Sequence, residues 1–269
     1  MTTLTVRGRA VRTVAALHLP AMPSAAQPGA RSLSEVEDYA LRNARIAFEN
    51  GIEALYIQDL GDSPVAPSAT PHTIARITAV GSALRRSFPD APLGVCLMAH
   101  GAEAPLAVAQ AMDADFVRLK VYLGAMVKAE GVLQGCAWEA IQYRAAIRAE
   151  EVRILADVYD RTGIPLAPLP IREAVRQATT YGHADGVVLT GADLGETLRM
   201  VSEVRGAEQG VPLIAGGGVT VETVARALGT ADAVIVSTAL KRVASWSPAG
   251  LESDWDPQQV RAFVLAAAL

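Results

Sequence analysis

The sequence predicts an α/β fold in which eight parallel strands, each followed by a helix, close into a (β/α)8 (TIM) barrel that forms a single domain over residues 1–269. Short, almost continuously apolar runs alternate with amphipathic stretches, and eight such pairs follow one another along the chain. Such strands are typical of a parallel sheet whose outer face is covered by helices. Eight repeats favour closure over an open sheet, and no linker rich in Pro or Ser divides the chain. The length of 269 residues suits one barrel, although a two-domain α/β protein would also fit it.

Each expected strand is an apolar run rich in β-branched residues, and each expected helix repeats its apolar residues at helical spacing. The strands are expected at 13–18, 54–59, 93–98, 116–121, 152–158, 186–190, 212–216 and 233–238. The helices are expected to include 34–50, 70–87, 137–149, 171–181, 194–205 and 221–228.

Three aspartates come immediately before expected strands, each after an alanine: Asp115, Asp185 and Asp232. They fall at the N-terminal ends of the strands, where a TIM barrel is stabilised and catalysis does not occur. We therefore expect structural roles for them.

Four stretches look irregular: 20–33, 61–69, 122–135 and 243–256. The first three follow strands, which is the position of lids and ligand-binding loops. The fourth carries Trp246 and Trp255, which could cover a ligand or pack in a subunit contact, and we favour the contact. The apolar tail 263–269 adds to the expectation of a homo-oligomer.

Charge and composition indicate which classes of partner and which cellular compartment to expect. The net charge is −4 and the arginines are scattered, which argues against nucleic acid as a partner. No apolar run is long enough for membrane insertion. With only Cys96 and Cys136, the chain has no disulfide framework and no zinc-binding pattern, so we expect a soluble protein in the reducing cytoplasm.

The strongest functional signal is a pair of strand ends near the C-terminus. One expected strand stops at Gly216, Gly217 and Gly218, and the next stops at Ser237 and Thr238. Glycines let the backbone approach an anion closely, and loops after the last two strands of a TIM barrel form its common phosphate site. A phosphorylated small molecule is the expected ligand.

Polar residues also gather at the C-terminal ends of the earlier strands. Asp157, Lys120, Asp59 and His18 are the catalytic candidates, with Gln58, Arg118, Thr190 and Gly191 as substrate contacts. Arg118 and Lys120 share a strand face, and buried cations need anions nearby, so Asp157 is the expected partner of Arg118. Asp157 could act as a base or electrostatic anchor, or form a purely structural ion pair with Arg118.

Two other chemistries are open. Lys120 could form a Schiff base with a carbonyl substrate, because a lysine in an apolar pocket can have its pKa lowered. His18, Asp59 and His100 could instead gather a divalent metal, although they lack a tight ligand spacing, and no cofactor is the main expectation.

The chain resembles the BtpA/SgcQ family of TIM barrels from about residue 14 to 260. The matching segments are Ala16-Leu-His-Leu-Pro-Ala-Met-Pro23, Gly61-Asp-Ser-Pro64, Asp115-Phe-Val-Arg-Leu-Lys120, Glu130-Gly-Val-Leu-Gln-Gly135, Gln142-Tyr-Arg144, Leu155-Ala-Asp-Val158, Gly216-Gly-Gly-Val-Thr220 and Val234-Ile-Val-Ser-Thr-Ala-Leu-Lys241. The chain departs from the family at Gln58-Asp59, Ala99-His100, Lys120, Asp160-Arg161 and Gly191. The phosphate end is kept while the reacting end differs.

The resemblance implies a divergent member that acts on another substrate or has lost its chemistry. We expect an isomerase, lyase or glycosidic-bond-cleaving enzyme for a phosphorylated sugar or nucleotide-like molecule. The alternative is a non-catalytic assembly factor of the photosystem I biogenesis type, which uses the barrel as a scaffold.

Overall fold

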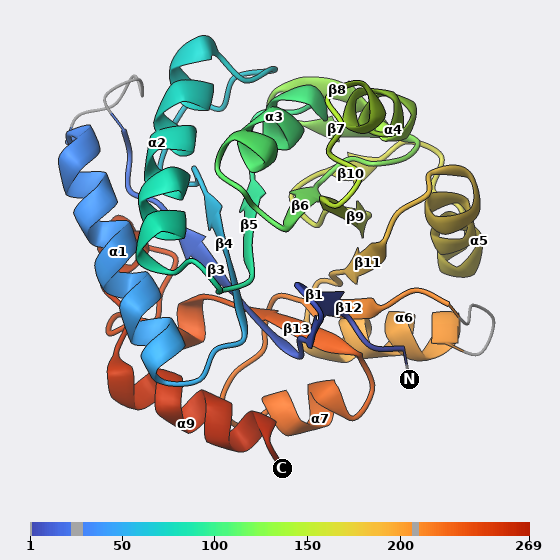
Figure 1. Cartoon of the computed structure of the whole chain (residues 1–269). Coiled ribbons are helices and arrows are strands. Elements are labelled where there is room, and N and C mark those ends of the chain that lie inside the picture. The colour runs from blue at the N-terminus through green and yellow to red at the C-terminus, as the bar shows by residue number, and fades with distance from the viewer. Residues whose placement is uncertain (1, 23–28, 206–209) are drawn as a thin grey trace.

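Eight parallel strands form a closed barrel in the computed structural model, which describes residues 2–22, 29–205 and 210–269. In barrel order they are β3 (Thr13–His18), β4 (Ala54–Gln58), β5 (Leu93–Cys96), β6 (Phe116–Leu119), β9 (Arg153–Val158), β11 (Gly186–Leu189), β12 (Leu213–Gly216) and β13 (Ala233–Val236). β13 pairs in parallel with β3, which closes the ring (Figure 1). The predicted fold is confirmed.

Helices surround the barrel (Figure 1). They are α1 (Leu33–Glu49), α2 (Pro71–Ser87), α3 (Glu103–Ala111), α4 (Ala137–Ala146), α5 (Ile171–Arg176) with the π-helical turn η1 (Gln177–Tyr181), α6 (Leu194–Arg205), α7 (Val224–Leu228), the short η2 (Thr238–Leu240) and α8 (Pro248–Leu251), and α9 (Pro257–Ala267). Local sequence fixes their starts: Ser32 and Glu35 form a capping box before α1, and Asp256 caps α9. None of the described helices is both long and apolar enough to cross a membrane.

Several strands end earlier than expected. Asp59, Lys120, Thr190 and Ser237 lie just past the last strand residue, and Thr238 begins η2, so all five lie beyond the strands at the C-terminal end of the barrel. Their side chains are therefore not part of the regular strand ladder.

Two small sheets were not expected. The hairpin of β1 (Thr5–Val6) and β2 (Arg9–Ala10) turns at Arg7 and Gly8, both with positive φ, and packs Leu4 and Val6 with the side chains inside the barrel. β7 (Ala125–Lys128), β8 (Gly131–Gln134) and β10 (Ile164–Pro165) form a three-stranded antiparallel sheet outside the barrel. The stretch 122–135 was expected to be irregular, but Gly131, with a φ of 112°, permits a tight turn between two strands. Of the loop 20–33, residues 23–28 lie outside the described part.

The expectation that Trp255 packs in a subunit contact is wrong. Its side chain is fully buried in the monomer, and its backbone N–H donates to Asn43 Oδ1 at 2.6 Å. Phe263 of the apolar tail is also fully buried. These two side chains belong to the core and cannot form a subunit contact.

The three aspartates before the strands have the expected structural roles. Each carboxylate accepts the backbone N–H at or next to the start of the preceding barrel strand and pairs with an arginine of the helix before that strand. The contacts are Asp115 with Leu93 and Arg85, Asp185 with Ile154 and Arg144, and Asp232 with Leu213 and Arg205. The repeated contact ties neighbouring β/α units together at the N-terminal end of the barrel.

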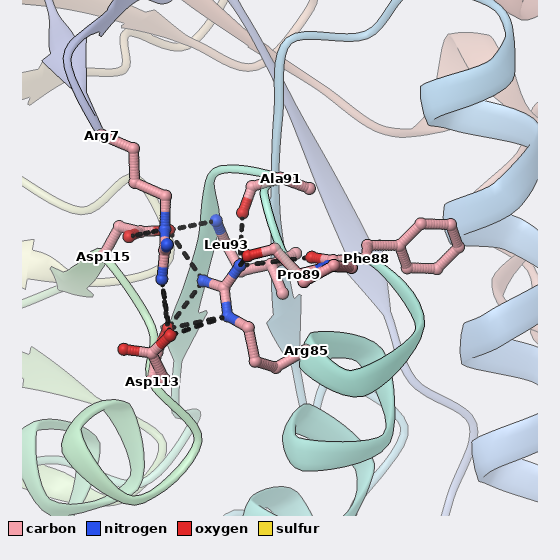
Figure 2. Close-up of polar contacts among 8 residues, drawn as sticks. All are labelled: Arg7, Arg85, Phe88, Pro89, Ala91, Leu93, Asp113 and Asp115. Atoms are coloured by element: carbon pink, nitrogen blue, oxygen red, sulfur yellow. Dashed lines mark hydrogen bonds and ion pairs between the residues drawn. The ribbon is translucent and has the colours of Figure 1, made fainter.

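Replacing Asp115 tests this role against a matched neighbour. Asp115 and Asp113 contact the same two arginines, Arg7 and Arg85, but the side chain of Asp113 is 73% exposed and that of Asp115 only 11% (Figure 2). We expect Asp115→Asn to lower the free energy of unfolding by about 2 kcal/mol, because it removes a buried charge-assisted contact. Asp113→Asn should cost less than about 0.5 kcal/mol. Equal shifts in urea midpoint would contradict the assignment.

Candidate functional site

A cavity of about 460 Å³ opens at the C-terminal end of the barrel, and we call it the mouth cavity. It brings together many of the residues predicted from the strand ends. These are His18, Gln58, Arg118, Lys120, Thr190, Gly217, Gly218, Ser237 and Thr238. They meet because parallel strands present all their C-terminal ends to one face of the barrel.

Backbone conformation and the lack of space for a Cβ both favour glycine at positions 216–218. Gly217 and Gly218 have φ of +73° and +72°, a conformation that L side chains rarely adopt. A Cβ on Gly217 would lie 3.0 Å from Nη1 of Arg161, and one on Gly216 would lie 2.3 Å from Thr190 Oγ1. Gly216 ends β12 outside the cavity wall and leaves room for Thr190, whereas Gly217 and Gly218 form the wall itself.

Arg161 is a site residue for which the sequence analysis offered no role. It lines the mouth cavity beside Gly217, and in the described part of the chain no carboxylate lies within 4.0 Å of its guanidinium. Its position in the sequence, after the fifth barrel strand and next to Asp160, is the one signal that could have marked Arg161 as a site residue. An unpaired arginine beside a glycine turn is a suitable partner for an anion.

Lys120 is the second cation of the cavity wall without an ion-pair partner among the described residues. Its Nζ donates to the carbonyl of Met98 at 2.6 Å. Burial lowers the pKa of this amine, and Lys128 lowers it further. A buried amine with a lowered pKa can act as a polarising acid or, when deprotonated, as a nucleophile.

Arg118 and Asp157 form the expected buried ion pair. Nε and Nη2 of Arg118 each lie 2.9 Å from a different oxygen of Asp157, and Nη1 donates to the Tyr56 hydroxyl at 2.6 Å. Burial raises the pKa of the Asp157 carboxyl, and the guanidinium opposes that shift. Asp157 has both oxygens engaged and lies outside the mouth cavity, so this geometry favours the structural alternative over a role as base.

Asp59 and Gly191 also lie outside the cavity wall. Asp59 accepts the Met98 N–H at 2.7 Å, and burial raises the pKa of its carboxyl to about 6. The N–H of Gly191 donates to Thr197 Oγ1 at 2.9 Å. Both residues hold loops in place around the site, and their predicted roles in catalysis and substrate binding stay predictions.

The metal alternative finds no geometric support in the described residues, where no group of three or more His, Cys, Asp or Glu side chains is placed to hold an ion. His100, one of the three suggested ligands, has Nε2 2.6 Å from the carbonyl of Gln134.

His18 lies in the cavity wall next to Ser237 and Trp246, which follow the last barrel strand. Its Nδ1 is 3.2 Å from Ser237 Oγ, and its ring centroid is 5.7 Å from that of Trp246. Trp246 also lines the mouth cavity, which is the position that covering a ligand requires, and its role stays a prediction. The ammonium of Lys241 donates to the carbonyls of Gly250 and Leu251 and so anchors the segment that carries Trp246.

The buried imidazole makes stability depend on pH. Burial, with contributions from Lys241 and Arg118, lowers the pKa of His18 from 6.5 to about 3. Below pH 6.5 the unfolded chain binds this proton while the folded chain does not, so stability falls as pH drops toward 3. This group should remove about 2 kcal/mol between pH 7.5 and pH 5.

The measurement is urea unfolding of the wild type and of His18→Asn across that range. Asp59 has the opposite effect, because its raised pKa makes the folded state bind a proton first as pH falls through 6. Asp59 is present in both proteins, so the difference between them isolates His18. Parallel curves of stability against pH would contradict the prediction.

Comparison with known proteins finds a family model and relatives that match most of the chain. The model of the BtpA family matches residues 9–268. An uncharacterised protein of Archaeoglobus fulgidus is 32% identical over 85% of this chain and 91% of its own length. The photosystem I biogenesis protein BtpA of Synechocystis is 28% identical over 95% of this chain and 87% of its own length.

Solved structures share the architecture at low sequence identity. KGPDC from Streptococcus mutans superposes with a TM-score of 0.59 and 13% identity over 96% of this chain and 97% of its own. N-(5'-phosphoribosyl)anthranilate isomerase from Pyrococcus furiosus has a TM-score of 0.52 and 14% identity over 96% and 98%. At this identity the likeness concerns the fold alone.

Proposed function

This chain belongs to the BtpA family, and from that premise we propose that it is an enzyme acting on a phosphorylated sugar or nucleotide-like small molecule bound in the mouth cavity. The observation that carries the proposal is that one cavity wall combines two left-handed glycines with Lys120 and Arg161, two cations that have no ion-pair partner among the described residues. The name of the phosphoribosylanthranilate isomerase specifies a phosphorylated substrate on the same fold, which supports the proposal.

In this proposal the phosphate lies against the backbone of Gly217 and Gly218, with Thr238 and Ser237 on the neighbouring strand end and Arg161 on the outer side. Backbone N–H groups and a guanidinium stabilise a dianion without a second charged side chain. The remaining atoms of the substrate then extend toward Lys120 and His18.

The cavity wall supports carbonyl chemistry over glycosidic cleavage. Glycosidases use two carboxyl groups. In the described part of the chain the wall contains one carboxylate, Asp160, which is held by Lys128 at 2.5 Å and by Thr162 at 2.8 Å. We infer that Lys120 polarises a carbonyl oxygen of the substrate in an isomerisation or aldol-type cleavage.

His18 would assist as a neutral hydrogen-bond donor, since its lowered pKa keeps the imidazole uncharged. If Ser237 donates to Nδ1, the proton of the ring is on Nε2, which has no partner among the described residues. That N–H can then bind a developing oxyanion.

The test is a thermal-shift panel of phosphosugars and nucleotides, followed by turnover assays on the compounds that stabilise the protein. Lys120→Met should keep the melting shift, because the phosphate contacts remain, and lose turnover by at least about 100-fold. If the amine attacks the carbonyl, borohydride added during turnover would trap a Schiff base on Lys120. If Lys120 stays unmodified, its role is to polarise the carbonyl and not to attack it.

A non-catalytic assembly role is the second candidate, favoured by the Synechocystis relative named for photosystem I biogenesis. It predicts that stabilising phosphocompounds are bound but not converted, and that Lys120→Met leaves cellular function unchanged.

A further inference from the structure

The three-stranded sheet of β7, β8 and β10 carries apolar side chains on both of its faces. On the inner face Met126 and Leu133 are buried against Val121. On the outer face Val127 lies opposite both Val132 and Ile164 in the strand register, and all three side chains are exposed to solvent. The solvent face of an antiparallel sheet is normally polar, so this row indicates a surface that another molecule covers.

The row extends beyond the sheet. Trp138, at the start of α4, shares a groove with Val132 and Leu166, and Leu169 follows on the same loop. We call Val127, Val132, Trp138, Ile164, Leu166 and Leu169 the outer apolar face. Their residues are between 40% and 78% exposed. Figure 1 places β7, β8 and β10 beside α4 at the rim of the barrel.

We propose that the outer apolar face is a subunit interface and that its occupant is the same face of a second copy of this chain. A fully exposed aliphatic side chain presents ~60–120 Å² and a tryptophan ~200 Å². Scaled by the exposed fractions of the six residues, the outer apolar face presents about 400 Å² of apolar side chain to solvent. Two copies would bury about 800 Å² of it, and since interfaces are roughly 60% apolar the whole contact would reach about 1,300 Å². That area lies within the roughly 1,200–2,000 Å² of stable specific interfaces.

The charge of the face agrees with self-association. The other residues that share the outer side of β7 and β8 are Ala125 and Gln134, which pair with each other, so these positions carry no charge. The sheet part of the face therefore meets its own copy by a two-fold rotation without like-charge repulsion. The interface differs in place from the one expected from Trp255 and the C-terminal tail.

The proposed interface borders the site without forming it. Leu166 and Leu169 also line a small apolar cavity of about 90 Å³ whose inner wall includes Lys120 and Asp157. A second copy on the outer apolar face would cover the side of the molecule on which Leu166 and Leu169 are exposed. This inference does not depend on the proposed reaction.

The test is sedimentation velocity of the purified full chain. The wild type should sediment as a dimer of about 56 kDa, twice the 28.2 kDa of the chain. Ile164→Lys and Trp138→Lys should each weaken dimerisation by at least 100-fold, with melting temperatures of the isolated monomers showing that they are folded. Leu265→Lys is the matched control, because Leu265 is 65% exposed on α9, away from the face, and its dimer should persist.

Three results would overturn the proposal. The first is a wild type that stays monomeric at 100 µM protein. The second is a dimer that Ile164→Lys and Trp138→Lys leave intact, which would place the interface elsewhere. The third is a monomer that binds lipid vesicles through Trp138, which would make a lipid surface the occupant.

Discussion

Asp157→Ala is expected to lower the free energy of unfolding by about 3–5 kcal/mol, because it leaves a buried guanidinium without its anion. Arg118 gives Asp157 two hydrogen bonds of 2.9 Å inside the barrel, and the Tyr56 hydroxyl is the remaining partner. A neutral hydroxyl cannot replace the carboxylate. Urea unfolding at pH 7 measures the effect.

A double replacement provides the control. In Arg118→Met with Asp157→Leu, both charges are removed and the volume is largely kept, so most of the lost stability should return. If the double variant is as unstable as Asp157→Ala, the loss comes from packing and not from the unpaired charge. If Asp157→Ala instead costs under about 1 kcal/mol while turnover disappears, Asp157 is catalytic and the structural interpretation is wrong.

Gly217→Ala is expected to weaken the binding of inorganic phosphate by about 10- to 100-fold. The added Cβ would lie 3.0 Å from Nη1 of Arg161, so the guanidinium must shift by a few tenths of an ångström away from the proposed phosphate position. Weakening this charge-assisted contact removes up to the roughly 1.5–3 kcal/mol that such a contact contributes. The φ of +73° adds strain to the same turn. Isothermal titration calorimetry with phosphate gives the affinity.

Gly124→Ala controls for backbone strain. Gly124 has a φ of +66°, a Cβ there would meet no atom within 4 Å, and the residue lies outside the mouth cavity. Its variant should lose stability through strain and keep the wild-type affinity for phosphate. Equal losses of affinity in the two variants would show that the effect of Gly217→Ala is not local.

The barrel could be predicted because its strands are written in the sequence as apolar runs, each followed by a helix. The aspartates before the strands could be assigned a structural role for the same reason, since their position is fixed by the strand that follows. The pairing of β10 with β7 could not be predicted, because β10 is two residues long and a long stretch of chain separates the two strands. Local patterns do not report such pairing.

The site residues that could be predicted are those at or just after the C-terminal ends of the barrel strands. His18, Lys120 and Gly217 meet in one cavity because they follow parallel strands. Arg161 and the position of Trp246 depend on how long loops fold back over the barrel, which periodicity does not specify. Asp157 was correctly paired with Arg118, but only the geometry shows that the pairing uses both of its oxygens.

The most direct test of phosphate binding in the mouth cavity is a crystal structure of the wild type soaked in inorganic phosphate. We predict electron density for one anion against the backbone nitrogens of Gly217 and Gly218, within hydrogen-bond distance of Thr238. Density for phosphate only at other places on the protein, with this cavity holding water alone, would contradict the account.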